Sequence, residues 1–192
     1  VQQTDGSSNL SLINPQTNDI SQLTHFSQGE QVYSPTWHPN GNHIYMGTAD
    51  TYSRNIYVYN QQSNNIEPVL KDYLIDYRDP HVSSDGKHLY FAADPDGIFN
   101  LYRIPLDQQH PVPQKLTSVP GGAFMPHLSG ETLYFAEFKA SGYKVSSINV
   151  SNLSNGNKDD RTNRYQLTKQ SGFKLLNSSK AGQRPALDHI TA

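Results

Sequence analysis

The sequence predicts an all-β protein assembled from one repeated unit of four short antiparallel strands. Proline recurs at nearly even spacing, at Pro35, Pro80 and Pro126, with steps of 45 and 46 residues. A turn ending in glycine follows each of these prolines after a few residues. The 192 residues include 12 Tyr, 13 Gly and 12 Pro, a composition typical of short strands joined by many turns.

The unit at 78–117 shows most clearly why each strand is expected. An inner strand at roughly 79–83 ends at Asp85-Gly86, where glycine supplies the positive φ that a tight hairpin needs. The aromatic, β-prone run at 88–91 gives the second strand, and apolar and polar residues alternate over 100–104 in the third. The fourth and outermost strand follows at 113–117, where an edge position tolerates proline.

A repeat of about 40–45 residues with this content matches one blade of a β-propeller. The predicted fold is therefore an all-β propeller segment with three complete four-stranded blades, at 33–70, 78–117 and 124–168. Partial blades are expected at both ends, over 1–32 and 173–192. Because propellers close with roughly 4–8 blades, we expect the segment to belong to a larger propeller. Open blade edges also favour self-association, since unpaired strands template pairing.

Composition excludes several classes of function. The net charge of −2 provides no basic field for a phosphate backbone, so nucleic acid is not an expected partner. The chain has no cysteine, which excludes disulfides and thiolate sites, and no membrane span is expected in this segment because no run of 18 apolar residues occurs. Neither G-x-S-x-G nor H-E-x-x-H is present, so we expect no catalytic residues, no cofactor and no metal site.

The repeat also resembles a known family. Residues 34–41 (Ser-Pro-Thr-Trp-His-Pro-Asn-Gly) and 79–86 (Asp-Pro-His-Val-Ser-Ser-Asp-Gly) resemble the P-x-x-S-P-D-G-K-x-I-x-F repeat of TolB-like, WD-repeat-like β-propellers. Residues 99–104, followed by 114–117, are similar to that family's N-I-Y … L-T ending. The resemblance covers about 9–190 and implies a propeller. Its role is left open, because the repeat serves TolB, tricorn-like and prolyl-oligopeptidase-like peptidases, and periplasmic propellers of bacterial surface proteins.

Two histidines occupy the same place in successive units. His81 and His127 each follow the repeated proline, on strands that line the channel of a propeller, so we expect them to approach each other. Such a pair could hold a metal or an anionic ligand, but Thr36 takes this place in the first unit, which favours a polar channel residue inherited from the repeat. We predict that His81, His127, Arg78 and Asp79 are contact residues at the mouth of the propeller channel. For Arg78 and Asp79 the alternative is an ordinary salt bridge between blades.

Two further features are weaker candidates. The loop at 94–97 (Asp-Pro-Asp-Gly) resembles the start of a calcium loop, but it has no acid at its far end, so a structural turn is the favoured interpretation. Tyr52, Tyr73 and Tyr77 are expected in loops, where aromatic side chains can form a contact surface for a partner.

From the resemblance and the missing catalytic motifs, the favoured function is a non-catalytic scaffold that binds a protein or peptide. The resemblance implies the periplasm or cell envelope of a Gram-negative bacterium as its location. Two alternatives stay open, the substrate-gating propeller domain of a serine peptidase and a metal-dependent or sugar-active propeller enzyme. The first has no hydrolase motif in these residues. For the second, Asp76, Asp79 and Asp85 lie close together in sequence, but turn and loop roles explain each of them.

Overall fold

The computed structural model describes residues 1–4 and 6–151. All of them lie in the first of the two compact units into which the chain divides, 1–156 and 157–192. The predicted fourth strand of the third blade at 164–168 and the predicted partial blade at 173–192 lie outside the described residues.

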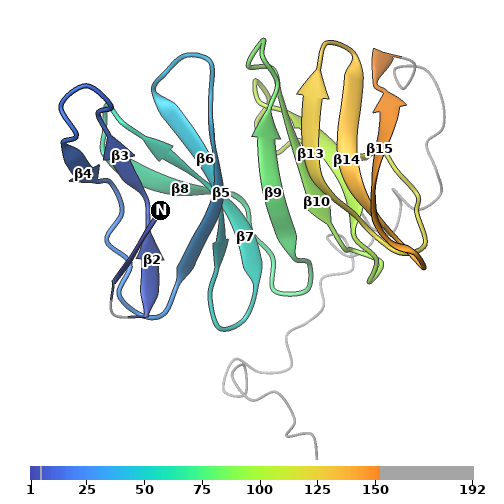
Figure 1. The fold of residues 1–192 in the computed structure, drawn as a ribbon, viewed down its shortest axis with the longest axis horizontal. Coiled ribbons are helices and arrows are strands. Elements are labelled where there is room, and N and C mark those ends of the chain that lie inside the picture. Colours follow the sequence, from blue (N-terminus) through green and yellow to red (C-terminus); the bar gives the residue numbers. More distant parts are fainter. Residues whose placement is uncertain (5, 152–192) are drawn as a thin grey trace, which may run out of the picture. The chain divides into compact units, whose positions relative to one another are not determined.

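Every regular element of the described part, apart from a short turn at its end, is a β-strand (Figure 1). Two sheets are four-stranded and antiparallel, with the strands in chain order. The first contains β5 (Gln31–Trp37), β6 (His43–Ala49), β7 (Arg54–Asn60) and β8 (Asn65–Leu70). The second contains β9 (Tyr77–Val82), β10 (His88–Ala93), β11 (Asn100–Pro105) and β12 (Gln114–Lys115).

A third sheet follows with three described strands, in the same antiparallel order. They are β13 (Ala123–Ser129), β14 (Thr132–Lys139) and β15 (Gly142–Asn149). The predicted glycine turns are confirmed, since Gly41, Gly86 and Gly130 have φ of 72°, 71° and 57°. These sheets confirm the predicted fold class, an all-β propeller of antiparallel blades.

The N-terminal residues form two short pairs of strands. The third blade position is taken by β2 (Ser7–Asn9) with β3 (Ser11–Ile13), and the fourth by β4 (Ile20–Gln22), which pairs with β3. The additional strand β1 (Gln2–Thr4) pairs with β2, so this partial blade has three of the four blade positions. The strand β1 has no sequence signal, because Gln-Gln-Thr has neither the apolar content nor the alternation of a strand.

A buried asparagine ties the third strand of a blade to the end of its fourth. Asn100 Oδ1 accepts hydrogen bonds from Thr117 Oγ1 (3.0 Å) and from the Val119 backbone N–H (2.9 Å), while Thr117 Oγ1 accepts from the Leu101 N–H (2.9 Å). In the N-terminal blade Asn9 and Thr24 repeat this arrangement, at 3.0 Å between the side chains. This is the physical basis of the N-I-Y … L-T pattern, because each buried polar atom of the clamp is satisfied.

Neighbouring sheets pack face to face through apolar side chains. Tyr90 and Leu101 of one sheet lie in the same cluster as Leu133 and Phe135 of the next, and Tyr90, Leu101, Leu133 and Phe135 are all buried. Full burial of a side chain of this size contributes about 1.5–3 kcal/mol, so these contacts hold successive blades together. As a result β5, β9 and β13, the first strands of the three sheets, lie side by side.

Two aromatic residues differ from the sequence expectation. Tyr77 was expected in a loop, but it begins β9 and is buried, with its ring 5.9 Å from that of Phe91. Its neighbours in the sequence are polar, so no pattern indicated that Tyr77 is buried. The second is Trp37, a residue type that is usually well buried, which ends β5 and is exposed.

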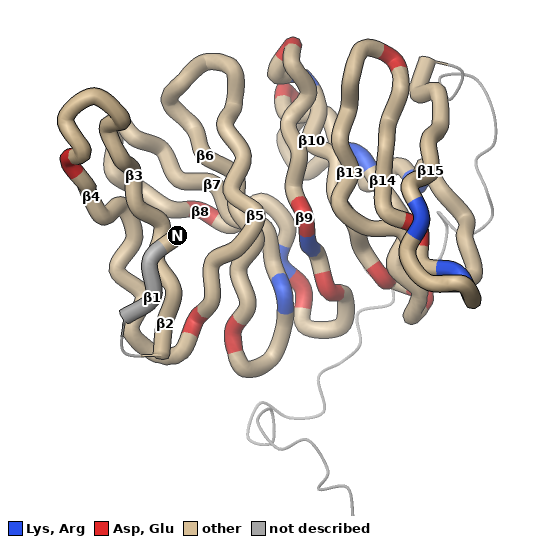
Figure 2. Tube along the Cα trace, viewed as in Figure 1, with Lys and Arg blue, Asp and Glu red and all other residues tan. Residues whose placement is uncertain are grey.

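Charged residues are spread over the described part. Figure 2 shows basic and acidic residues interspersed along loops and strand ends, as the small net charge suggests. Within the described ranges, no helix has the length and hydrophobicity needed to cross a bilayer.

Candidate binding site at the inner strands

The three inner strands share one irregularity, centred on the repeated proline. In each sheet the pairing between the first and the second strand shifts its register once. The shift lies between Tyr33 and Thr36 in β5 and between Phe124 and His127 in β13. In the β9–β10 pair it lies between Tyr90 and Ala92 of β10. At each shift the residue before the proline has positive φ, 47° at Ser34, 55° at Asp79 and 52° at Met125.

This irregularity is a β-bulge repeated in three successive blades. Proline has no N–H to donate to the neighbouring strand, and a non-glycine residue in the left-handed region costs roughly 1–2 kcal/mol. Bulges re-aim side chains, and here they turn the residues around each proline toward the same space. The sequence interpretation started the inner strand β9 at about residue 79, with Pro80 marking its entry, whereas β9 begins at Tyr77 and Pro80 lies inside it.

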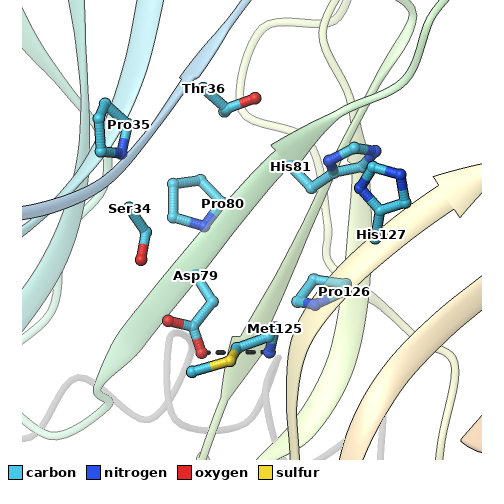
Figure 3. A pocket seen from close by; sticks show the side chains of 9 residues that line it. All are labelled: Ser34, Pro35, Thr36, Asp79, Pro80, His81, Met125, Pro126 and His127. Atoms are coloured by element: carbon cyan, nitrogen blue, oxygen red, sulfur yellow. Dashed lines mark hydrogen bonds between the residues drawn. The ribbon is translucent and has the colours of Figure 1, made fainter. Parts of the chain in front are cut away.

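The residues around the three bulges line one pocket of about 310 Å³. Each inner strand contributes the residue before the proline, the proline and the residue after it, and we call these three sets the inner triads (Figure 3). They are Ser34-Pro35-Thr36, Asp79-Pro80-His81 and Met125-Pro126-His127. The Met125 side chain is 63% exposed at this pocket, a high value for a large apolar residue. No pattern in the sequence distinguishes Met125 from a core residue, so it was not among the predicted contacts.

The two predicted histidines meet in this pocket. The ring centroids of His81, on β9, and His127, on β13, are 4.6 Å apart, with the ring planes inclined by 52° (Figure 3). Burial, and next the neighbouring His127, hold the pKa of His81 below its ordinary value of 6.5, while a hydrogen bond to the Leu128 backbone acts in the opposite direction. Burial disfavours the charged imidazolium, and a second imidazolium nearby would repel it.

Arg78 and Asp79 lie beside the histidines but are engaged with the next blade. Asp79 is only 5% exposed, and its Oδ2 accepts hydrogen bonds from Arg78 Nε (3.1 Å) and from the Met125 backbone N–H (3.2 Å). The Arg78 guanidinium lies 5.7 Å from the ring centroid of Phe99 and 5.3 Å from that of Phe124. Both residues therefore fix β9 against β13, by a charge-assisted hydrogen bond and by cation–π contacts.

The remaining candidates are placed elsewhere. Asp96 pairs with Lys115 (2.9 Å), and Asp94 Oδ1 accepts the Asp76 backbone N–H (2.8 Å), as expected for a structural turn. Among the described residues no group of three His, Asp or Glu side chains could hold a metal ion. Tyr52 and Tyr73 are exposed, as predicted for loop residues.

Comparison with solved structures identifies the fold. TolB from Acinetobacter baumannii superposes with a TM-score of 0.64 at 19% identity, over 74% of this chain and 35% of that one. A putative TolB from Agrobacterium tumefaciens gives 0.65 at 20% identity, over 75% and 53%. The tricorn protease gives 0.57 at 13% identity, over 75% and 20%. No protein-family model and no curated protein matched the sequence.

These likenesses, together with the sheets described above, define the class of protein as a β-propeller. More particularly, its blades superpose on those of two TolB structures, in agreement with the resemblance of the repeat to TolB-like propellers. The chain spans about a third and a half of the length of the two TolB structures. What the comparisons support is therefore a propeller scaffold.

Proposed function

We propose that this propeller is a non-catalytic scaffold that binds a protein or peptide segment at the inner triads. The observation that supports this most strongly is that the same three positions, on the inner strands of three successive sheets, line one pocket. A sheet framework held by interblade packing presents these residues in fixed positions, as propellers and other rigid scaffolds present their binding residues.

The chemistry of the pocket suits an extended segment that carries an apolar side chain. The three prolines offer rigid apolar surfaces, and the exposed thioether of Met125 adapts to partners of different shape. His81, His127 and Thr36 add hydrogen-bonding groups. In this proposal the two histidines contact the partner, while Arg78 and Asp79 hold the bulges in place behind them.

A peptide selection tests the proposal. Peptides selected from a displayed random library against the purified chain would be titrated by calorimetry into the parent chain and two variants. Met125→Glu places a charge in the pocket, and we expect it to weaken binding by about tenfold or more, because a charge in an apolar contact is costly. The control Tyr73→Glu changes an exposed residue outside the pocket and should bind as the parent does. Equal affinities of the two variants would contradict the proposal.

The location and the alternative role follow from the same likeness. We propose the periplasm or cell envelope of a Gram-negative bacterium, because the repeat resembles TolB-like propellers.

The likeness to the tricorn protease keeps the substrate-gating propeller of a serine peptidase as the second candidate function. The 192 residues contain no G-x-S-x-G, so this role requires a hydrolase elsewhere. A gene encoding such a domain in the same reading frame would favour it.

We further propose that the outer face of the third sheet associates with a second copy of the chain. Val145 is 83% exposed, whereas Leu101 and Ile56, which hold the equivalent register positions, are fully buried. Tyr134 is likewise 44% exposed, against 2% for Tyr90. The N-terminal blade exposes two apolar residues that lie opposite each other, Ile13 and Ile20, and it can supply the covering sheet from a second molecule.

A further inference from the structure

The imidazole pair carries an inference that does not depend on the proposed peptide binding. His81 and His127 come from adjacent inner strands, and their rings meet at the pocket wall (Figure 3). We propose that these two side chains form a binding site for one divalent transition-metal ion, such as Zn²⁺, Ni²⁺ or Cu²⁺.

The distance between the rings fits a shared ion. Metal–nitrogen bonds to imidazole are about 2.0–2.1 Å long, so two imidazoles that share one ion at an angle between square-planar and tetrahedral have centroids roughly 4.5–5 Å apart. The observed separation is 4.6 Å.

The surroundings of His81 also suit a ligand. The hydrogen bond to the Leu128 backbone occupies one side of the imidazole, as metal-binding histidines commonly use one ring nitrogen to orient the other. Beyond His127, the pocket residue facing His81 from β5 is Thr36, which carries no charge.

The site is open rather than complete. In the part of the chain that the structure describes, no third His, Asp or Glu joins the pair. Water, or a carboxylate or imidazole of a bound partner, would occupy the other coordination positions, as in metal sites that keep an exchangeable ligand. Nitrogen ligands favour Zn²⁺, Ni²⁺ and Cu²⁺, whereas Mg²⁺ and Ca²⁺ require oxygen ligands. We therefore expect modest affinity and clear selectivity.

Metal titration of the purified chain, first treated with a chelator, tests the site. We expect calorimetry with Zn²⁺ and Ni²⁺ to show one site, no heat above dilution with Mg²⁺, and at least a tenfold loss of affinity in His81→Gln and in His127→Gln. The control His110→Asn changes an exposed histidine with φ of 54°, a conformation that asparagine tolerates, and should leave this site unchanged. Circular dichroism of each variant would establish that it is folded.

Electron paramagnetic resonance with one equivalent of Cu²⁺ gives a readout that does not depend on affinity. The spectrum of the parent chain should report two coordinated imidazole nitrogens, and that of each single variant should report fewer. If the double variant His81→Gln/His127→Gln binds Zn²⁺ and Ni²⁺ as the parent does, or if the parent binds neither ion, the proposed site does not exist.

Discussion

Single polar residues inside the blades carry much of the fold's specificity, and Asn100 is the clearest case. Asn100→Ala would leave the Thr117 hydroxyl and the Val119 N–H without their acceptor. An unsatisfied buried polar group costs about 1–3 kcal/mol, so we expect a loss of about 2–3 kcal/mol in the free energy of unfolding. Urea denaturation measures it. The exposed Asn65→Ala should change stability by no more than about 0.5 kcal/mol, and equal effects of the two substitutions would show that the clamp contributes nothing.

His81 gives a prediction about pH at the same scale. Its folded-state pKa is below the ordinary value of 6.5, so the unfolded chain binds more protons in the interval between the two. The stability that neutral His81 contributes is therefore complete above about pH 6.5 and is lost as the pH falls toward the folded-state pKa.

Nuclear magnetic resonance of the ring protons in metal-free protein tests this directly. We expect His81 to titrate below its ordinary pKa, and His127→Gln to raise that pKa only in part, since burial remains the larger cause. A His81 pKa at or above 6.5 in the parent chain would contradict the packing described for the pocket.

At this scale the sequence predicted the identity of the histidine pair but not the role of its neighbours. The equal offset of His81 and His127 from the repeated proline was sufficient, because equivalent positions of adjacent inner strands must lie near each other. The structural role of Asp79 could not be predicted from such an offset. Its function as the acceptor for the Met125 N–H depends on the orientation of a side chain across two blades, 46 residues apart in sequence.

The repeated bulge is the element on which the pocket depends. Ser34→Val should destabilise the protein by about 1–2 kcal/mol, because a β-branched residue is strongly disfavoured at φ of 47°. Ser34 is exposed, so lost packing does not complicate the comparison. Thr36→Val, two residues further along β5, keeps a β-branched residue and should cost about 1 kcal/mol or less. Thermal unfolding compares the two, and a smaller loss for Ser34→Val would argue against the left-handed bulge.

Strand content was predictable at this scale, but the bulge was not. Alternation and glycine turns indicated four strands per blade, and the sheets of β5–β8 and β9–β12 have them. A residue before proline normally adopts an extended conformation, so the sequence did not predict the positive φ of Ser34, Asp79 and Met125. The presence of proline within a strand is a known sign of a bulge and was the one available signal.

For the whole molecule, the exposed face of the third sheet predicts association. We expect sedimentation velocity of the chain to show a concentration-dependent dimer or larger species, and Val145→Lys to shift it to at least about tenfold higher concentration, since a buried, unpaired charge is costly. Tyr73→Lys, at an exposed loop residue, should associate as the parent does. A parent chain that stays monomeric at high concentration would show that something other than a second copy covers this face.

The central claim is that the inner triads of three successive blades form one binding site. Chemical-shift mapping of the labelled chain with a selected peptide measures this most directly. We predict that the largest perturbations fall on His81, Met125 and His127, with Thr36 also affected, and that Tyr52 and Tyr73 stay unchanged. Perturbations confined to Tyr52, Tyr73 and their loops, with the inner triads silent, would contradict the account.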